Sequence, residues 1–309
     1  MKILMSLVNR NRKLFFRDKG MLVSAMITPI ILIVLYATFL AKVYRDSFLS
    51  NMPETLPISD KLINGTVAGQ LAAALLAVSC VTVTFCVNLT MVQDRVYGSR
   101  RDFDVSPVRK PMIYLGYFFS TVLNSLMVNM VALAACFVYV WKMGWFLRAG
   151  DVAFLIVDII LLVLFGTVLS SVVCYPLKTQ GQMSAVGTVV SAGYGFVCGA
   201  YMPISNFGEG LQKALSYLPG TYGTALLKNH MLRGAFEEME AQGFPSQVVK
   251  AISNSLDCNP VFRGHTVEPE IMLLIMLGSV VGLGSIYLIN KLVYLILYIQ
   301  MEQLHLHLI

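Results

Sequence analysis

Six long runs of almost unbroken apolar side chains constrain the fold of this chain more than any other feature. The runs are residues 21–41, 66–92, 112–140, 152–175, 182–201 and 271–290. A helix that crosses the hydrocarbon layer of a bilayer needs roughly 20 predominantly apolar residues. Lipid cannot satisfy unpaired backbone groups, and the runs are too long for barrel strands of about 10 residues. We therefore expect six transmembrane helices.

Composition agrees with a membrane protein. Of the 309 residues, 57% are hydrophobic and 13% are charged, whereas about 25% are charged in an ordinary soluble domain. Much of such a surface cannot face water. The connections leave no room for a separate soluble domain, so we expect an all-α polytopic membrane protein with a single domain over residues 1–309.

The lysine and arginine residues of the short connections predict the orientation, because cytoplasmic loops carry an excess of them. Thirteen lie on the side of the N-terminus, and five lie in the two short loops opposite. The thirteen are Lys2, Arg10, Arg12, Lys13, Arg17, Lys19, Arg95, Arg100, Arg101, Arg109, Lys110, Lys178 and Lys291, and the five are Lys42, Arg45, Lys61, Lys142 and Arg148. We expect a bacterial cytoplasmic membrane, both termini in the cytoplasm, and residues 202–269 outside.

The first 20 residues combine apolar and basic side chains at helical spacing. Leu7, Leu14 and Phe15 fall on one side of a helix, and Arg12 and Lys13 fall largely on another. This pattern predicts an amphipathic helix in the inner interface of the lipid bilayer. The helix is either a simple anchor or an elbow that also contacts a cytoplasmic partner.

The cytoplasmic turn at residues 93–110 carries charges of both signs and two aromatic rings. A solvated loop needs neither Tyr97 nor Phe103. A short helix pressed into a groove of another protein would use both rings, with the charges fixing its register. The alternative is an ordinary positive-inside loop, in which only the sum of charges matters.

Several motifs resemble one membrane family. A basic N-terminus precedes a span with Pro29, and the inner loop holds Gly98 and then Ser106-Pro107. More specific are residues 199–205, Gly-Ala-Tyr-Met-Pro-Ile-Ser, and residues 217–222, Tyr-Leu-Pro-Gly-Thr-Tyr. This order resembles the type-2 ATP-binding-cassette exporter permeases over nearly the whole chain. The resemblance is weakest in residues 237–267.

The resemblance implies a coupling helix at residues 93–105 that would sit in a groove of a separate ATPase. Its residues would be Asp94, Arg95, Tyr97, Gly98, Ser99, Arg100, Arg101, Phe103 and Val105, although Gly98-Ser99 matches the family pattern only loosely. The resemblance also implies re-entrant outer helices between spans five and six that close an outer gate. The gate residues would be Tyr201, Pro203, Leu211 and Pro219.

Periodicity independently supports helices in this outer segment. Phe207, Leu211, Leu215 and Leu218 repeat at helical spacing in a stretch too short to span a membrane. This helix would either form part of the gate or simply cap the ends of the spans. Residues 246–256 predict a further outer helix.

Polar groups inside the spans are candidates for a substrate path, because each is costly in hydrocarbon. The candidates are Phe85, Asn88, Asn124, Asn129 and Tyr194. Interhelical hydrogen bonding is the alternative role of the asparagines. Asp158 is the costliest group, and its role is either functional or structural, the structural role being to snorkel to the interface or to pair with another helix. Gly187, Ser191 and Gly195 form a small-x-x-x-small pattern that lets another helix approach, in this subunit or in a dimer.

The sequence contains no nucleotide-binding motif and no arrangement typical of a metal site or an enzyme. We expect a transport subunit that binds no cofactor, no metal and no nucleic acid, while a partner ATPase binds ATP and Mg²⁺. Five of the six cysteines lie inside the runs, and a bridge between Cys198 and Cys258 stays open as a possibility.

These observations predict the permease subunit of an ATP-driven exporter, paired with a second permease subunit as a homodimer or heterodimer. Its substrate would be amphipathic: a drug, an antimicrobial peptide, a lipid or a polysaccharide. One alternative is an ion-coupled secondary transporter, which would be expected to carry coupling carboxylates near the bilayer midplane. Another is a membrane assembly or sensor protein without transport.

The orientation can be tested with single added cysteines. In Ser99→Cys, impermeant thiol reagents should label the new thiol only after the cells are opened, and in Ser246→Cys they should label intact cells. The unmodified chain, with its own cysteines, is the control. The reverse pattern would contradict both the orientation and the cytoplasmic place of the coupling loop.

Overall fold

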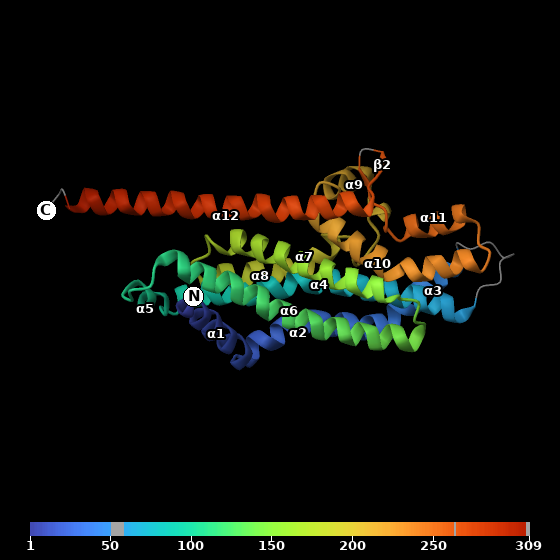
Figure 1. Ribbon diagram of the computed structural model, residues 1–309, viewed down its shortest axis with the longest axis horizontal. Helices are drawn as coiled ribbons and strands as arrows, with labels where there is room; N and C mark the ends of the chain where they lie inside the picture. Colours follow the sequence, from blue (N-terminus) through green and yellow to red (C-terminus); the bar gives the residue numbers. More distant parts are fainter. Residues whose placement is uncertain (51–58, 263, 307–309) are drawn as a thin grey trace.

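The fold, seen in a computed structural model that describes residues 1–50, 59–262 and 264–306, is a helical bundle (Figure 1). The helices are α1 (Lys2–Arg17), α2 (Lys19–Leu35), a π-helical turn (Tyr36–Leu40), α3 (Ala41–Ser50), α4 (Asp60–Val96), α5 (Arg100–Asp104), α6 (Lys110–Met143), α7 (Ala149–Cys174), α8 (Gln180–Val197), a 3₁₀ turn (Ile204–Asn206), α9 (Glu209–Leu215), α10 (Pro219–Ala241), α11 (Ser246–Ser255) and α12 (Pro269–Leu306). Strands β1 (Val261–Phe262) and β2 (His265–Thr266) form a small antiparallel hairpin. The predicted all-α fold is confirmed.

Five helical segments of the described chain are long and apolar enough to cross a membrane. They are Lys19–Asp46, Asp60–Val96, Lys110–Met143, Ala149–Cys174 and Pro269–Ile289. The remaining predicted span, residues 182–201, corresponds to α8, which has 18 residues and carries Gln180 and Gln182 in its first turn. The structure therefore supports five of the six predicted spans.

Helix α4 is the centre of the bundle. It is buried over 94% of its most apolar window, and it packs against α6, α7, α10, α2 and α8. Small side chains such as Ala73 and Ala77 let these neighbours come close. At Gly166 of α7, an added Cβ would lie 2.5 Å from the hydroxyl oxygen of Thr84 and 3.2 Å from the Cα of Val81. A larger residue at 166 would push the two helices apart.

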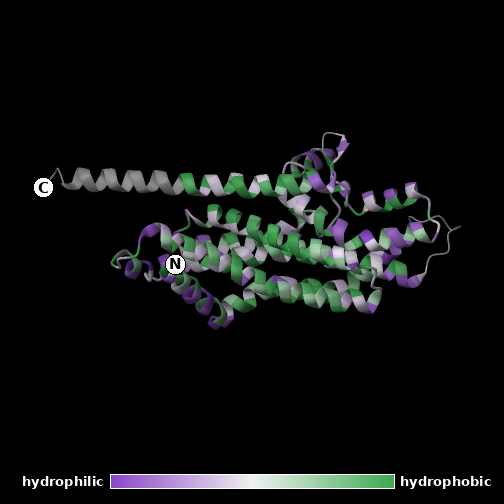
Figure 2. Cartoon of the chain, in the orientation of Figure 1, coloured by the Kyte–Doolittle hydropathy of each residue, from purple (hydrophilic) through white to green (hydrophobic). Residues whose placement is uncertain are grey.

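The helices at the periphery of the bundle expose apolar faces. Val23, Ile27, Ile31 and Val34 of α2 are each about half exposed or more. Figure 2 shows hydrophobic residues along the middle of the bundle and hydrophilic residues gathered at its two ends. Continuous apolar surface of this size is unfavourable in water. Lipid is the environment that suits it.

The two ends of the bundle carry different elements. The N-terminus, α1 and α5 lie in one half of the bundle, and α9, α11 and the β hairpin lie in the opposite half (Figure 1). Helix α12 runs from that opposite half back along the bundle. The amphipathic helix predicted for residues 1–20 forms as α1, with Leu7, Val8, Asn11 and Phe15 buried. The placement of α5 away from α11 matches the predicted separation of the coupling loop from the outer segment.

The outer segment is more ordered than the sequence suggested. The helix predicted at residues 246–256 is confirmed as α11. Sequence periodicity did not indicate α10, which has 23 residues and packs against α4, α7 and α12. Gly234 lets α10 lie against the connection between α6 and α7, because an added Cβ would lie 1.9 Å from the backbone oxygen of Phe146.

Candidate coupling and gating sites

The turn between α4 and α6 projects two apolar side chains away from the bundle. Gly98 takes a left-handed backbone (φ 85°), which favours glycine, and α5 begins two residues later. The side chain of Tyr97 is 70% exposed and that of Val105 is 87% exposed. Arg101 is also exposed. These three residues give the turn a surface suited to a partner.

Asp94 is not part of that surface, because it is buried in a cluster that joins α1, α4 and α6. The guanidinium of Arg10 binds both carboxylate oxygens, one of them at 3.0 Å. The hydroxyl of Tyr117 donates to the same carboxylate at 2.5 Å. Burial alone would lower the pKa of Arg10, but the hydrogen bond and charge of Asp94 outweigh it and raise the pKa. Arg10 therefore stays charged.

Phe103 links α5 to this cluster. Its half-buried ring packs on the core, and the guanidinium of Arg10 lies 5.1 Å from the ring centroid, within the range of a cation–π contact. Next along α1, the amide nitrogen of Asn11 donates to the hydroxyl of Ser120 at 3.4 Å. The elbow helix therefore contacts the coupling turn directly.

Arg95 and Arg100 also bind within the subunit. Arg95 donates to the backbone oxygens of Tyr175 (2.5 Å) and Leu177 (3.2 Å) at the start of the α7–α8 connection. Arg100 donates to the hydroxyl of Tyr114 at 2.8 Å. Tyr97, Arg101 and Val105 are thus the exposed members of the predicted coupling set. The members that contact the rest of the subunit are Asp94, Arg95, Arg100 and Phe103.

The predicted substrate-path residues lie inside the bundle. Phe85, Asn88, Asn124 and Asn129 are each at most 3% exposed, and Tyr194 is partly buried with its hydroxyl covered. Asn88 of α4 donates to the hydroxyls of Ser170 (3.0 Å) and Ser171 (3.2 Å) on α7.

On α6 the amide groups are less well satisfied. Asn129 donates to the backbone oxygen of Ser125 at 2.8 Å. Neither amide atom of Asn124 has a hydrogen-bond partner among the described residues. Buried groups of this kind are costly unless they find a partner. Asn124 is therefore the predicted path residue with the most unused polar capacity.

The predicted gate residues surround the turn after α8. Gly199 is left-handed (φ 71°), and the ring of Tyr201 folds back so closely onto Gly195 that an added Cβ would lie 2.3 Å from it. The hydroxyl of Tyr44 donates to the backbone oxygen of Tyr201 at 3.4 Å. Pro203 precedes the 3₁₀ turn, Leu211 on α9 is 48% exposed, and Pro219 begins α10.

The small residues of α8 face their own subunit. Gly195 is covered by Tyr201, and the nearest atom to a Cβ on Gly187 belongs to Leu89 of α4, at 3.8 Å. The opposite side of α8 is exposed, with Ser184 and Thr188 one turn apart. Within this chain, Gly187 therefore lies beside α4, and Gly195 makes room for the turn that follows α8.

A row of contacts between charged or titratable side chains joins α10 to α7, and the sequence did not indicate these contacts. Asp158 is 2% exposed, and its carboxylate lies 2.6 Å from Nδ1 of His230. The ring of Phe154 stacks on His230 with centroids 4.9 Å apart. Sequence reasoning recognised the cost of burying Asp158, but the helical period of α10 was hidden by its buried glycine and threonine residues.

The row continues beyond this pair. Arg233 of α10 lies 4.0 Å from Asp151 of α7, and Glu237 of α10 forms an ion pair with Arg148 at 2.6 Å. We call the contacts of His230, Arg233 and Glu237 with α7 and its N-cap Arg148 the α7–α10 seam. Asp158 is thus paired with another helix, one of the structural roles expected for it.

The remaining sequence features are the cysteines and the side chains that could bind a metal. Cys198 and Cys258 are both buried and both free. Within the described residues, no group of three histidine, cysteine or acidic side chains is arranged to hold a metal ion.

Comparison with known proteins decides the class. The sequence profile of the family described as "ABC-2 type transporter" matches residues 3–232. The chain belongs to the ABC-2 type transporter family. No curated protein matches the sequence. In this family the permease lacks an ATPase domain, and a partner ATPase binds ATP. The resemblance seen in the motifs is confirmed, and the chain is a multi-pass membrane permease domain.

The cluster around Asp94 yields a testable expectation. Arg10→Met should leave a buried carboxylate without its cation, which commonly costs about 3–5 kcal/mol in a fully buried pair. Because Arg10 is partly exposed, we expect a smaller loss of about 1–3 kcal/mol, seen as a lower thermal midpoint of the purified protein. Arg12→Met is the matched control, since Arg12 is exposed and, among the described residues, its guanidinium donates a hydrogen bond to the side chain of Asn9 alone. Equal midpoints in the two variants would contradict the role of the cluster.

Proposed function

We propose that this chain is the membrane subunit of an ATP-driven exporter, in which the turn around α5 receives the motion of a separate ATPase. The family match over residues 3–232 supports the permease class. The observation that carries the coupling role is the exposure of Tyr97 and Val105, which flank the short helix α5. Exposed rings of this kind are typical anchors of protein interfaces.

The internal contacts of the turn support its role in transmission. Phe103 contacts Arg10, Arg10 binds Asp94, and Asp94 lies near the end of the central helix α4. A force on α5 therefore reaches α1 and α4 through charged and aromatic contacts. Arg95 extends the same network to the connection between α7 and α8.

We propose that α8 is the sixth span and that it faces a second permease subunit. Its exposed side carries Ser184, Ala185, Thr188 and Ala192. Small side chains allow close approach of helices in a bilayer. A helix that is too polar for lipid becomes acceptable when a second subunit or an aqueous path covers its exposed side.

The substrate would be amphipathic and would enter from the inner side or inner leaflet. The hydrogen bonds of Asn88 to α7 favour the interhelical role for this amide, and Asn124 and Asn129 are buried inside the same subunit. The path would then follow the exposed face of α8 between two subunits. Drugs, antimicrobial peptides, lipids and polysaccharides all remain candidate substrates.

We propose that α9 and α10 form the outer gate. Helix α10 packs between α4, α7 and α12, and the α7–α10 seam fixes its position along α7. Opening of the gate would require α10 to move and the seam to break.

A secondary transporter is the second candidate, because the buried pair of Asp158 and His230 could exchange a proton. The two candidates differ in their energy source. Purified alone in lipid, the chain should neither bind nor hydrolyse ATP, and ATPase activity should appear only when a second polypeptide co-purifies. Substrate movement by the isolated chain, driven by a proton or sodium gradient, would instead establish the secondary transporter.

The coupling surface is tested by removing one ring at a time. Tyr97→Ala should leave membrane levels normal, because the side chain is exposed, but it should weaken recovery of the ATPase and reduce export. Truncation of an interface aromatic commonly costs more than about 1 kcal/mol, or roughly fivefold in affinity.

Phe103→Ala is the informative comparison. Because Phe103 packs on the core and under Arg10, its loss should lower both the thermal midpoint and export. Normal export and normal ATPase recovery in Tyr97→Ala would show that the turn serves topology alone.

A further inference from the structure

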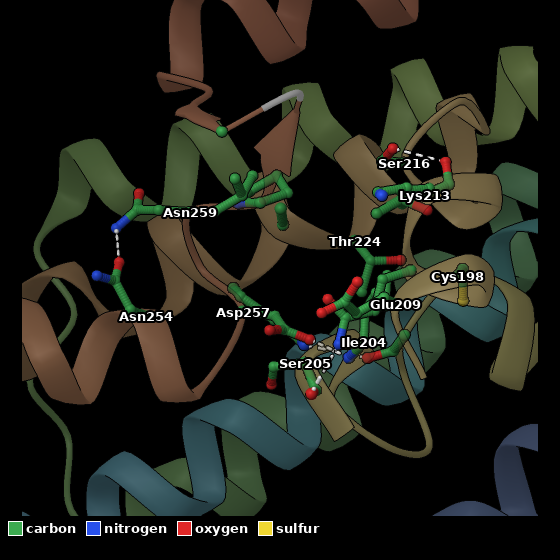
Figure 3. A pocket seen from close by; sticks show the side chains of 18 residues that line it. Cys198, Ile204, Ser205, Glu209, Lys213, Ser216, Thr224, Asn254, Asp257 and Asn259 are labelled. Atoms are coloured by element: carbon green, nitrogen blue, oxygen red, sulfur yellow. Dashed lines mark hydrogen bonds between the residues drawn. The ribbon is translucent and has the colours of Figure 1, made fainter. Parts of the chain in front are cut away.

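A cavity of about 590 Å³ lies among the elements of the proposed outer gate, and the gating role alone does not account for the charges that line it. It lies between α9, α10 and the loop after α11 (Figure 3). Its volume falls within the usual range for small-molecule sites. Charged side chains of both signs line it, namely Glu209, Lys213, Lys228 and Asp257.

Lys228 is the buried cation of the cavity, with 1% of its surface exposed. Its ammonium donates to the backbone oxygens of Gly199 (3.1 Å) and Leu256 (3.0 Å). An ammonium has three N–H donors, so one remains after these two hydrogen bonds. Burial lowers the pKa of Lys228, and the nearby charge of Asp257 acts in the opposite direction. An acidic group of a ligand would favour the charged lysine further.

Asp257 is held in the wall by an unusual backbone. It is the only non-glycine residue in the described part of the chain with a positive φ, 54°. Such a conformation is uncommon and persists where the surrounding structure fixes it. Its carboxylate accepts a hydrogen bond from the backbone N–H of Ile204, which ties the loop to the segment before α9.

Glu209 and Lys213 add an exposed pair of charges, one turn apart on α9. Neither forms an ion pair with any described residue. In the view of Figure 3, Asp257 and Glu209 lie on one side of Thr224, and Lys213 lies on the other. A simple cation or anion would match only one of these sides. A ligand that carries both charges would match both.

We propose that this cavity binds a small zwitterion, with its ammonium group against Asp257 and Glu209 and its carboxylate or phosphate group against Lys213, while Lys228 stays fixed to the wall by the backbone oxygens of Gly199 and Leu256. An amino acid or short peptide has this chemistry, and so does an ethanolamine phosphate headgroup of a lipid. The site goes beyond the proposed transport function, because its occupation requires neither ATP nor the ATPase.

The test is calorimetric titration of the purified full-length chain with four probes. Two are zwitterions, alanyl-alanine and glycerophosphoethanolamine, and two carry a single kind of charge, ethanolamine and glycerol phosphate. We expect saturable binding of at least one zwitterion, with the other two probes weaker by about tenfold or more. Stronger binding of the dipeptide identifies a peptide source, and stronger binding of glycerophosphoethanolamine identifies a lipid headgroup.

Variants of the exposed pair locate the binding. Glu209→Gln and Lys213→Met should each weaken zwitterion binding by about tenfold, with the fold intact because both side chains are exposed. Glu240→Gln and Lys250→Met remove the same charges from exposed positions outside the cavity and should leave the affinity unchanged. Equal binding of all four probes, no binding of either zwitterion, or full affinity in both cavity variants would overturn the proposal.

Discussion

The burial of α4 on all sides is the constraint on which the rest of the structure depends. A helix in this position can neither face lipid nor expose polar groups to water, so every neighbour has to fit its surface. Its run of small residues from Ala72 to Ala74 permits this, and the glycine at 166 brings α7 closer still. A polar atom on α4 is therefore costly unless it finds a partner within the bundle, as Asn88 does on α7.

The same constraint explains why charges concentrate at the two ends of α4. At the inner end, Asp94 remains buried because Arg10 and Tyr117 satisfy it. Towards the opposite end, α10 supplies charged partners to α7. Between these ends, the contacts of α4 are apolar or involve neutral hydroxyls and amides. The charged contacts of the bundle are therefore concentrated towards its two ends.

Sequence reasoning predicted most of the fold, because hydrophobic run length depends only on local composition. It identified the helical class, five spans that the structure supports, the amphipathic α1 and the outer helix α11. It did not reveal α10, because residues 220–228 are all buried and include glycine, threonine and lysine, so that the apolar side chains form no single stripe. The six cysteines of the chain gave no information about function, since five of them lie in apolar runs.

The candidate sites were predicted less completely, for a physical reason. Sequence places Asp94, Tyr97 and Phe103 in one turn, but only the fold decides which of them faces inward. Arg10, which lies 84 residues before Asp94 in the chain, determines this for the carboxylate. His230 was missed in the same way, because its significance comes from a residue 72 positions earlier.

The spacing of the α7–α10 seam limits how α10 can move. Its three α10 residues, at positions 230, 233 and 237, lie on one face of the helix and meet partners spread along α7 and its N-cap. A slide by one helical turn, about 5.4 Å, would take all three from their partners together. The three contacts therefore share one direction of displacement, so that a movement of α10 along α7 strains them together, whereas a movement away from α7 could separate them one after another.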